Sequence, residues 1–246
     1  MATGNASPSR RAGKDTWRPV IIAHRGGAAG FGLAENSREA FAAASAAGFG
    51  SECDAWASAD GEPVVMHDQE LARTTLVTGR VTDMISSALL QVHLRSAGTP
   101  AMVPLLRDVA CDVTLVEIKQ NNARDLVGRV IQVMEGREWR LQSFDRANLV
   151  YARELAPSVP VALLMSDLAG ATAAIAGGWP AYMDHGLLDE AVVARLRNGG
   201  LAVGAWTVNS EQALRRIAPF RPDVIISDVP QLIRDWLADE LPGGRW

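Results

Sequence analysis

Cysteine is scarce in this chain of 246 residues, and its two copies, Cys53 and Cys111, lie in apolar or strand-like runs. So few cysteines exclude a disulfide framework and give no support to a zinc or iron–sulfur site built on thiolates. The pattern instead predicts two reduced structural thiols in a cytosolic protein.

Basic residues are also fewer than acidic ones: the chain has 24 Lys and Arg and 28 Asp and Glu, for a formal net charge of −4. No basic run marks a surface for nucleic acid or membrane headgroups, so we expect neither partner. Long apolar runs are missing too, and no stretch reaches the roughly 18 residues that a membrane span needs. The first 18 residues are small, polar and basic, unlike a secretory signal, and we interpret 1–18 as a mobile tail.

What the chain does have is a regular alternation of short apolar runs with longer helical patterns, which is typical of βα units around a parallel sheet. We expect eight strands, at 19–25, 51–57, 113–119, 140–144, 160–165, 181–185, 201–208 and 223–228. We expect helices at 37–47, 123–136, 146–156, 167–177, 187–198, 210–218 and 230–240. This count and order predict an α/β fold of the TIM (β/α)8 barrel type over residues 19–246.

The connection that follows the second expected strand is too long for a simple βα loop. It spans about 56–100 and contains Asp60-Gly61, a strong turn signal between two strand-like runs. We therefore expect a small inserted subdomain here and no separate second domain.

Residues that carry chemistry fall at the carboxyl ends of these strands, where TIM barrels place their active sites. Because side chains alternate along a strand, Glu52 and Asp54 should share the interior face while Cys53 points outward. The same alternation puts Glu117 and Lys119 on one face at the end of the next core strand. Two histidines are placed in the same way, since His24-Arg25 ends the first strand and His67-Asp68 follows "PVVM" in the insertion.

The three acids Glu52, Asp54 and Glu117 would cost several kcal/mol to bury together unless a positive charge lay among them. Oxygen ligands favour Mg²⁺ or Ca²⁺, with Mn²⁺ as a further candidate and Zn²⁺ less suited. Positive side chains beside such an ion, here Arg25 and Lys119, suit a phosphoryl group. Imidazoles beside it, here those of His24 and His67, suit proton transfer near neutral pH.

Several motifs then resemble, in the correct order, the signatures of the glycerophosphodiester phosphodiesterase family. The motifs are "AHRGG", "AENSREAFAAASAAGF", "ECDAWASADGEPVVMHDQELARTT", "VPLLRDV", "VEIK", "SF", "WTVN" and "DVIISDVP". They run from about residue 19 to 235, and their order makes them far more specific than any one motif. The chain departs from the family at Ala34, where Pro is usual, and at Ser37, where Thr is usual.

The resemblance implies a TIM barrel with an inserted subdomain, a divalent cation held by Glu52, Asp54 and Glu117, and a His24/His67 acid–base pair. Such enzymes cut a glycerophosphodiester into glycerol 3-phosphate and an alcohol. By analogy, His67 takes the proton of the glycerol 2-hydroxyl, which attacks phosphorus to give a cyclic phosphodiester, and His24 protonates the leaving alcohol. Water then opens the cycle with the two roles exchanged.

The resemblance also assigns residues that bind the substrate. Arg25 and Lys119 would hold phosphate oxygens, and Trp206 would line the cleft with Asn209 behind it. Asn36 would either reach a phosphate oxygen or position the surroundings of the metal.

Other interpretations of the same residues stay open at this point. Strand-end acids are often only salt-bridge partners, Lys119 could pair structurally with Glu117, and a Trp such as Trp206 is more often a core residue. His93 and His185 are interpreted as ordinary solvated or satisfied histidines, with a place facing the cleft left open for His185 because it ends a predicted strand.

Two other functions also stay open. One is a lysophospholipase D-type or phosphosugar diesterase activity at the same site, which an apolar groove of Phe31, Leu33 and Trp56 would favour. The other is a catalytically silent binding barrel, which would predict the loss of a ligand or a histidine, although this chain keeps all five.

Overall fold

The computed structural model describes residues 17–96, 98–109, 111 and 113–240. Residues 1–16 of the expected mobile tail therefore lie outside the described residues.

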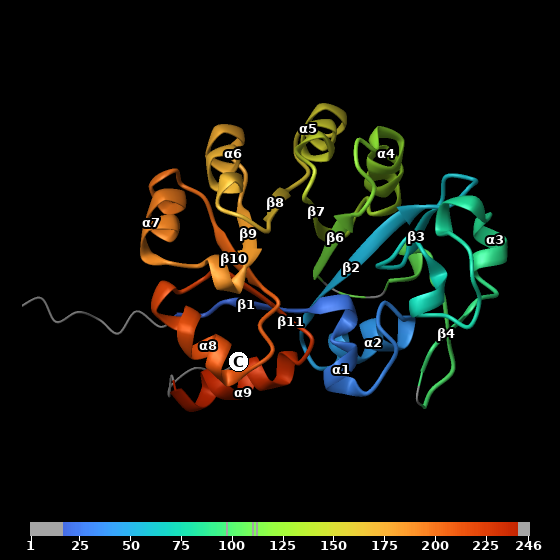
Figure 1. The fold of residues 1–246 in the computed structure, drawn as a ribbon, viewed down its shortest axis with the longest axis horizontal. Helices are drawn as coiled ribbons and strands as arrows, with labels where there is room; N and C mark the ends of the chain where they lie inside the picture. The colour runs from blue at the N-terminus through green and yellow to red at the C-terminus, as the bar shows by residue number, and fades with distance from the viewer. Residues whose placement is uncertain (1–16, 97, 110, 112, 241–246) are drawn as a thin grey trace, which may run out of the picture.

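Eight parallel strands close into a barrel, as Figure 1 shows. They are β1 (Val20–Ala23), β2 (Gly50–Ala57), β6 (Val113–Ile118), β7 (Glu138–Ser143), β8 (Val161–Met165), β9 (Ala181–Asp184), β10 (Val203–Trp206) and β11 (Val224–Ser227). The first strand pairs in parallel with both β11 and β2, and this double pairing closes the barrel. The predicted TIM barrel and its eight strands are confirmed.

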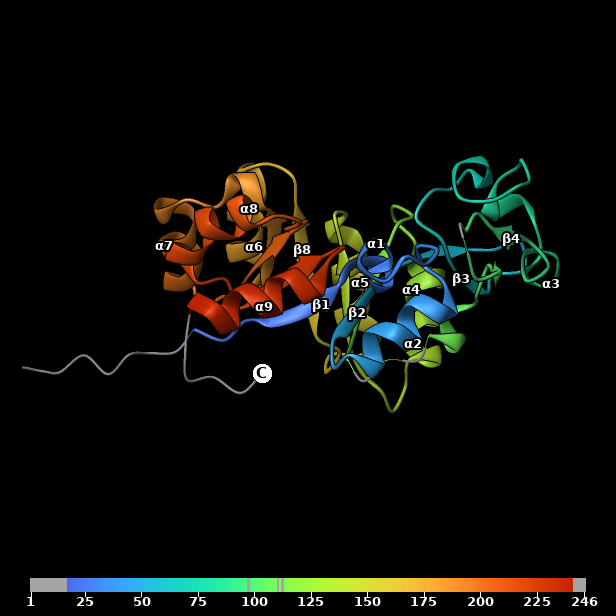
Figure 2. The ribbon, with the colours of Figure 1, turned by 90° about the horizontal axis from the view of Figure 1, so that it is seen from below.

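Helices form the outer layer of the barrel (Figures 1 and 2). They are α1 (Ala28–Phe31), α2 (Arg38–Ala46), α4 (Arg124–Val133), α5 (Arg146–Leu155), α6 (Ala169–Gly177), α7 (Glu190–Asn198), α8 (Glu211–Ile217) and α9 (Pro230–Glu240). Side-chain caps explain several of their starts. Ser37, for example, accepts a hydrogen bond from the backbone N–H of Ala40 at 3.1 Å, so Ser replaces the usual Thr without loss of the cap.

An insertion replaces the helix that would ordinarily follow β2. It contains β3 (Pro63–Val65), α3 (Ser86–Leu89), β4 (His93–Leu94) and β5 (Ala101–Met102), and ends in a 3₁₀ turn at Leu106–Asp108. The expected hairpin is present, because β3 pairs antiparallel with β2 and the Gly61 N–H donates to the Ser58 carbonyl at 2.9 Å. The insertion has its own buried apolar cluster and lies at one side of the barrel (Figures 1 and 2).

Side-chain alternation in β2 separates the polar interior from the apolar layer outside it. Cys53 is fully buried in the cluster between the barrel and its helices, as predicted, whereas Glu52 and Asp54 face the interior. The interior also holds an apolar cluster of Ile22, Leu115, Ala162, Leu164, Tyr182 and Ile226. The carboxylates therefore lie next to a buried apolar cluster inside the barrel.

Replacing Gly26 by Ala is expected to lower the free energy of unfolding by about 2–4 kcal/mol, as the sum of a left-handed backbone cost and overpacking. Gly26 has a φ of 82°, and a Cβ there would lie 2.7 Å from the Cβ of Ala40. Gly61 offers a matched control, because its φ is 81° but a Cβ would meet nothing within 4 Å. Urea unfolding of G26A and G61A would separate the two costs. Equal losses in both variants would contradict the close packing of Gly26 on α2.

Candidate active site

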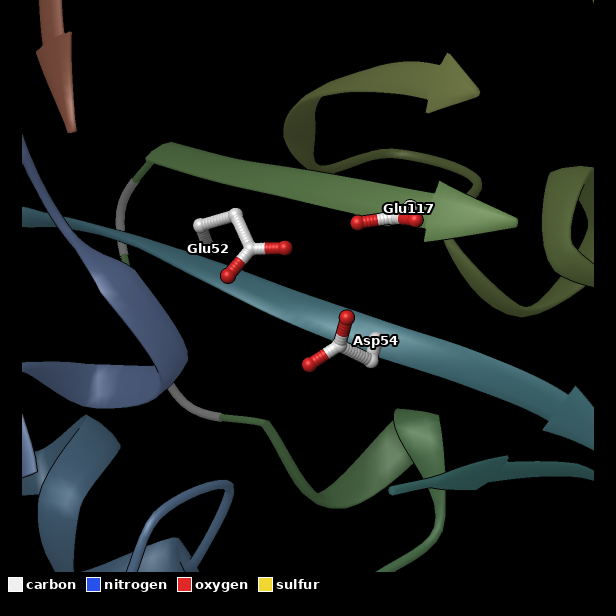
Figure 3. A group of neighbouring side chains, drawn as sticks. All are labelled: Glu52, Asp54 and Glu117. Carbon is white, nitrogen blue, oxygen red and sulfur yellow. The ribbon is translucent and has the colours of Figure 1, made fainter. Parts of the chain in front are cut away.

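Three carboxylates meet inside the barrel, two from β2 and one from β6. Asp54 and Glu117 are register partners on these neighbouring strands, and Glu52 lies two residues before Asp54 on the same face. One oxygen from each of the three lies within 4.8 Å of the others, and all three residues are buried. Figure 3 shows the three groups turned toward one another.

The electrostatics of this cluster show how strongly it needs positive charge. Burial, reinforced by the charge of Asp54, raises the pKa of Glu52 to about 7 and that of Glu117 to about 8. Burial acts in the same direction on Asp54, but the charges of Lys119 and then Arg25 outweigh it and lower its pKa. Among the described residues, Asp54 Oδ1 accepts no hydrogen bond, although the ammonium of Lys119 lies 3.4 Å away. A set of hard oxygen donors that includes this incompletely paired buried oxygen fits a divalent cation such as Mg²⁺ or Ca²⁺.

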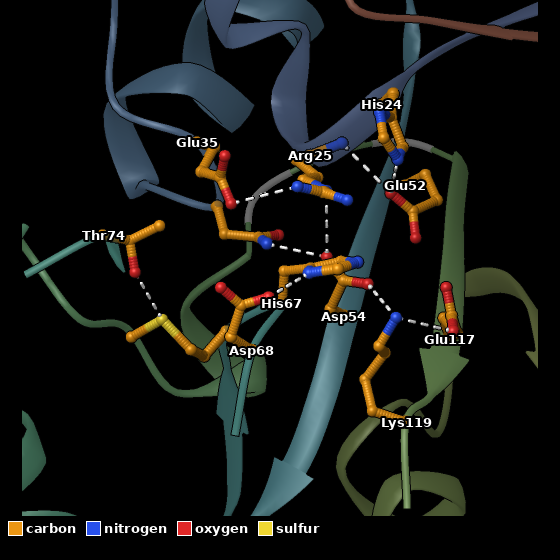
Figure 4. A network of polar contacts seen from close by, with 12 residues as sticks. His24, Arg25, Glu35, Glu52, Asp54, His67, Asp68, Thr74, Glu117 and Lys119 are labelled. Atoms are coloured by element: carbon orange, nitrogen blue, oxygen red, sulfur yellow. Dashed lines mark hydrogen bonds and ion pairs between the residues drawn. The ribbon is translucent and has the colours of Figure 1, made fainter. Parts of the chain in front are cut away.

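Three further side chains surround Asp54, and two of them, Arg25 and Lys119, are labelled in Figure 4. Lys119 Nζ lies 2.9 Å from Glu117 Oε1 and 3.4 Å from Asp54 Oδ1, so it bridges the two acids. Arg25 Nε lies 3.4 Å from Asp54 Oδ2, and Asn36 Nδ2 donates to the same oxygen at 2.8 Å. Asn36 is buried behind Asp54 and is absent from the described lining of the cavity, so its contacts favour positioning of Asp54 over contact with phosphate.

His24 is the first residue after β1, which ends at Ala23, two residues earlier than expected. Its Nδ1 lies 2.7 Å from Asp228 Oδ1, and its Nε2 lies 3.9 Å from Glu52 Oε2. Burial lowers the pKa of His24, but the hydrogen bond to Asp228 and the charge of Glu52 outweigh this, and the net shift is upward. The ring is thus anchored on one nitrogen while the other faces the carboxylates.

His67 enters from the insertion, two residues after β3. Its Nδ1 lies 2.5 Å from Asp68 Oδ1, and the other oxygen of Asp68 accepts from Arg73 Nε. Arg73 also donates to both oxygens of Glu35, at 2.6 and 3.0 Å, and Glu35 accepts from Arg25 Nη1 at 3.1 Å. Burial lowers the pKa of His67. This network ties the insertion to the barrel at the histidine, and Figure 4 shows its His67–Asp68 and Arg25–Glu35 contacts.

A cavity of about 140 Å³ adjoins this network. Its lining is His24, Arg25, Glu52, His67, Glu117, Lys119, Gln142, Phe144, Leu164, Trp206, Thr207 and Ile226. Trp206 packs edge-on against Phe144 at a ring-centroid distance of 5.6 Å, and its Nε1 donates to the carbonyl of Tyr182. The expected position of Trp206 in the cleft is therefore observed.

The apolar wall of this cavity differs from the expected groove of Phe31, Leu33 and Trp56. None of these three is in the described lining, and Trp56 instead packs in the insertion, where its Nε1 donates to the carbonyl of His67. By strand alternation Trp56 shares the face of β2 that carries Glu52 and Asp54, but it lies further along the strand, where β2 pairs with β3, and therefore packs in the insertion and not in the cavity lining. The wall consists of Phe144, Leu164 and Trp206 from the other side of the barrel.

Sequence reasoning did not single out three residues that the structure brings to the site. Gln142 lies in β7 and Asp228 directly follows β11, two strands that were correctly expected. The side-chain alternation that found Glu117 would therefore have placed both residues on the interior face, without giving their contacts. Gln142 Nε2 donates to Glu52 Oε1 at 3.3 Å. Arg73 had no such signal, because it reaches His67 only through Asp68 and lies on an irregular part of the insertion.

The other two histidines lie outside the cavity lining. His93 is exposed on β4, and His185 borders a neighbouring cavity of about 470 Å³ that shares Thr207 with the first.

A closed parallel barrel with a polar cavity at its carboxyl-end rim defines a TIM-barrel enzyme. The sequence model of the glycerophosphoryl diester phosphodiesterase family matches residues 24–232. Because the match covers most of the chain, the protein belongs to this family of phosphoric diester hydrolases.

Individual proteins are similar to this chain over most of its length. A protein of Bacillus subtilis, YqiK, is 30% identical over 243 residues that cover 89% of this chain and 99% of the relative. The crystal structure of a glycerophosphoryl diester phosphodiesterase of Silicibacter pomeroyi matches with a TM-score of 0.80 at 26% identity, covering 90% and 94% of the two chains. A phosphodiesterase of Oleispira antarctica, solved with the product sn-glycerol-3-phosphate, has the same fold, with a TM-score of 0.79 at 22% identity and coverage of 90% and 97%.

Proposed function

We propose that this protein hydrolyses glycerophosphodiesters to glycerol 3-phosphate and an alcohol in a metal-dependent reaction. The observation that carries the proposal is a cluster of three buried carboxylates beside one small cavity, which Glu52 and Glu117 line together with the two imidazoles. The family membership supports the reaction class, and the product bound to the Oleispira phosphodiesterase supports glycerol 3-phosphate as the product.

Glu52, Asp54 and Glu117 would hold the cation, with Mg²⁺ or Ca²⁺ as the expected ions and Mn²⁺ as a further candidate. When bound, the cation supplies Lewis-acid stabilisation of the negative charge on the phosphoryl oxygens. Arg25 and Lys119, which border the cavity, add positive charge on the same side.

Two proton transfers in each half of the proposed reaction complete it. His67 accepts the proton of the glycerol 2-hydroxyl as its oxygen bonds to phosphorus, and His24 donates a proton to the alcohol oxygen as the bond from phosphorus to that oxygen breaks. In the second half, His24 takes a proton from water, and His67 returns one to the 2-oxygen as the cyclic diester opens. Trp206 would line the substrate side of the cavity.

The test is the release of glycerol 3-phosphate from glycerophosphocholine, glycerophosphoethanolamine and glycerophosphoinositol. Coupling to glycerol-3-phosphate dehydrogenase measures this release. We expect release from at least one of these small diesters. A lysolipid included in the same panel covers the lysophospholipase D-type alternative, which faster turnover of the lysolipid would favour. If no diester is cleaved with Mg²⁺, Ca²⁺ or Mn²⁺, the catalytic proposal is wrong and a binding barrel is favoured.

We also propose a cytoplasmic location. Both cysteines are free, and Cys53 is fully buried, which suits a reducing compartment. Within the described part of the chain, none of the helices has the length and apolar character to cross a bilayer.

A further inference from the structure

Three neighbouring strands of the barrel each deliver one polar side chain to the rim beside the cavity. The strand order β10–β11–β1 is continuous, and Asn209, Asp228 and His24 follow these strands in turn. Their side chains form an unbroken series of hydrogen bonds. Asn209 Nδ2 donates to Asp228 Oδ2 at 2.5 Å, and Asp228 Oδ1 lies 2.7 Å from His24 Nδ1.

The amide of Asn209 is fixed in one orientation. Its Oδ1 accepts from the backbone N–H of Asp228 at 2.9 Å and from the hydroxyl of Ser227 at 3.3 Å. A flip of the amide would forfeit both bonds and turn an oxygen toward the carboxylate, so Nδ2 must face Asp228. Both oxygens of Asp228 are then committed, one to Asn209 and one to His24.

We infer that Asn209 and Asp228 are positioning residues that hold the His24 ring with Nδ1 outward and Nε2 toward the substrate cavity. The inference rests on the proposed function, in which Nε2 of His24 transfers the proton. An acceptor at Nδ1 also selects the tautomer with the proton on that nitrogen. Neither residue needs to touch the substrate for this role.

Exchanging the two side chains tests the inference directly. In Asp228→Asn, the new NH₂ group faces either the NH₂ of Asn209 or the N–H of His24, so two donors meet in both orientations. In Asn209→Asp, two carboxylates face each other. Each single variant should lower kcat about 10–100-fold, the usual effect of losing a group that orients a histidine, with little change in KM. The double exchange N209D/D228N rebuilds every bond, because the carboxylate at 209 accepts from the amide at 228, whose oxygen accepts from His24.

We expect the double exchange to recover at least tenfold over either single variant. A double variant no better than the worse single variant, or single variants with normal kcat, would overturn the inference. Asp223 provides a matched control, because it precedes β11 at the opposite end of the strand and accepts from the backbone N–H of Val203 at 2.8 Å. Asp223→Ala is expected to lower stability but leave kcat unchanged.

A spectroscopic readout separates this inference from the proposed function. The chain has only four histidines, so the hydrogen-bonded Nδ1–H of His24 can be assigned in an imidazole ¹⁵N–¹H spectrum by its loss in His24→Ala. The signal should also vanish in Asp228→Ala. A wild type that cleaves no diester but shows the signal, with loss of the signal in Asp228→Ala, would sustain the positioning and reject the function. Retention of both the signal and turnover in Asp228→Ala would reject the positioning role and leave the proposed function standing.

Discussion

Removal of divalent cations by EDTA is expected to abolish diester hydrolysis, and Mg²⁺ or Ca²⁺ to restore it. Glu52, Asp54 and Glu117 are buried within 4.8 Å of one another, and a hard cation is the group that best offsets their mutual repulsion. Because a catalytic metal stabilises transition-state charge by several kcal/mol, we expect a loss of about 10³-fold or more. The initial rate of glycerol 3-phosphate release measures it.

A variant of the cluster should reproduce the effect of the chelator and resist rescue. Glu117→Gln keeps the size of the side chain but removes its charge, so added Mg²⁺ or Ca²⁺ should not restore activity. In the wild type either ion should raise the melting temperature, since it binds only the folded state, and in Glu117→Gln this rise should shrink or vanish. Exposed Glu154 is the control, and Glu154→Gln should behave as the wild type. Chelator-insensitive turnover would reject the metal role.

The acidic cluster was predictable from sequence because its geometry follows from strand periodicity alone. Once two neighbouring strands are recognised, alternation places Glu52 and Asp54 on one face, and parallel pairing brings Glu117 beside them. The same reasoning placed Cys53 outside the barrel. No long-range information is needed beyond the order of the strands.

The support of the histidines was not predictable in this way. His24 and Asp228 are 204 positions apart, and their contact depends on barrel closure and on the turn after β1. The expected strand ran through Arg25, but the chain leaves the strand at Ala23, and Arg25 adopts a φ of 51°, which strand propensity does not indicate. The structure of the insertion was equally hard to predict, because short 3₁₀ turns carry no periodic signal. The contact between Arg73 and Asp68 could therefore not be predicted.

Replacing either of the two histidines proposed as acid and base is expected to reduce turnover about 10²–10⁴-fold, the usual contribution of a general acid or base. His24→Ala and His67→Ala remove imidazoles that border the cavity, whereas His93→Ala removes an exposed one on β4 and should leave kcat unchanged. Near-normal rates for His24→Ala or His67→Ala on glycerophosphocholine would reject the corresponding role.

The effects of replacing the two histidines should differ when the leaving group no longer needs a proton. With a glycerophosphodiester of p-nitrophenol, nitrophenolate departs unprotonated, so the defect of His24→Ala should shrink by at least tenfold relative to the choline ester. The defect of His67→Ala should persist, because the 2-hydroxyl must still lose its proton as it attacks phosphorus. The opposite pattern would exchange the two roles. Of the two histidines, Asp228 contacts only His24. The loss of kcat in Asp228→Ala should therefore be smaller with the p-nitrophenyl ester than with the choline ester, as for His24→Ala.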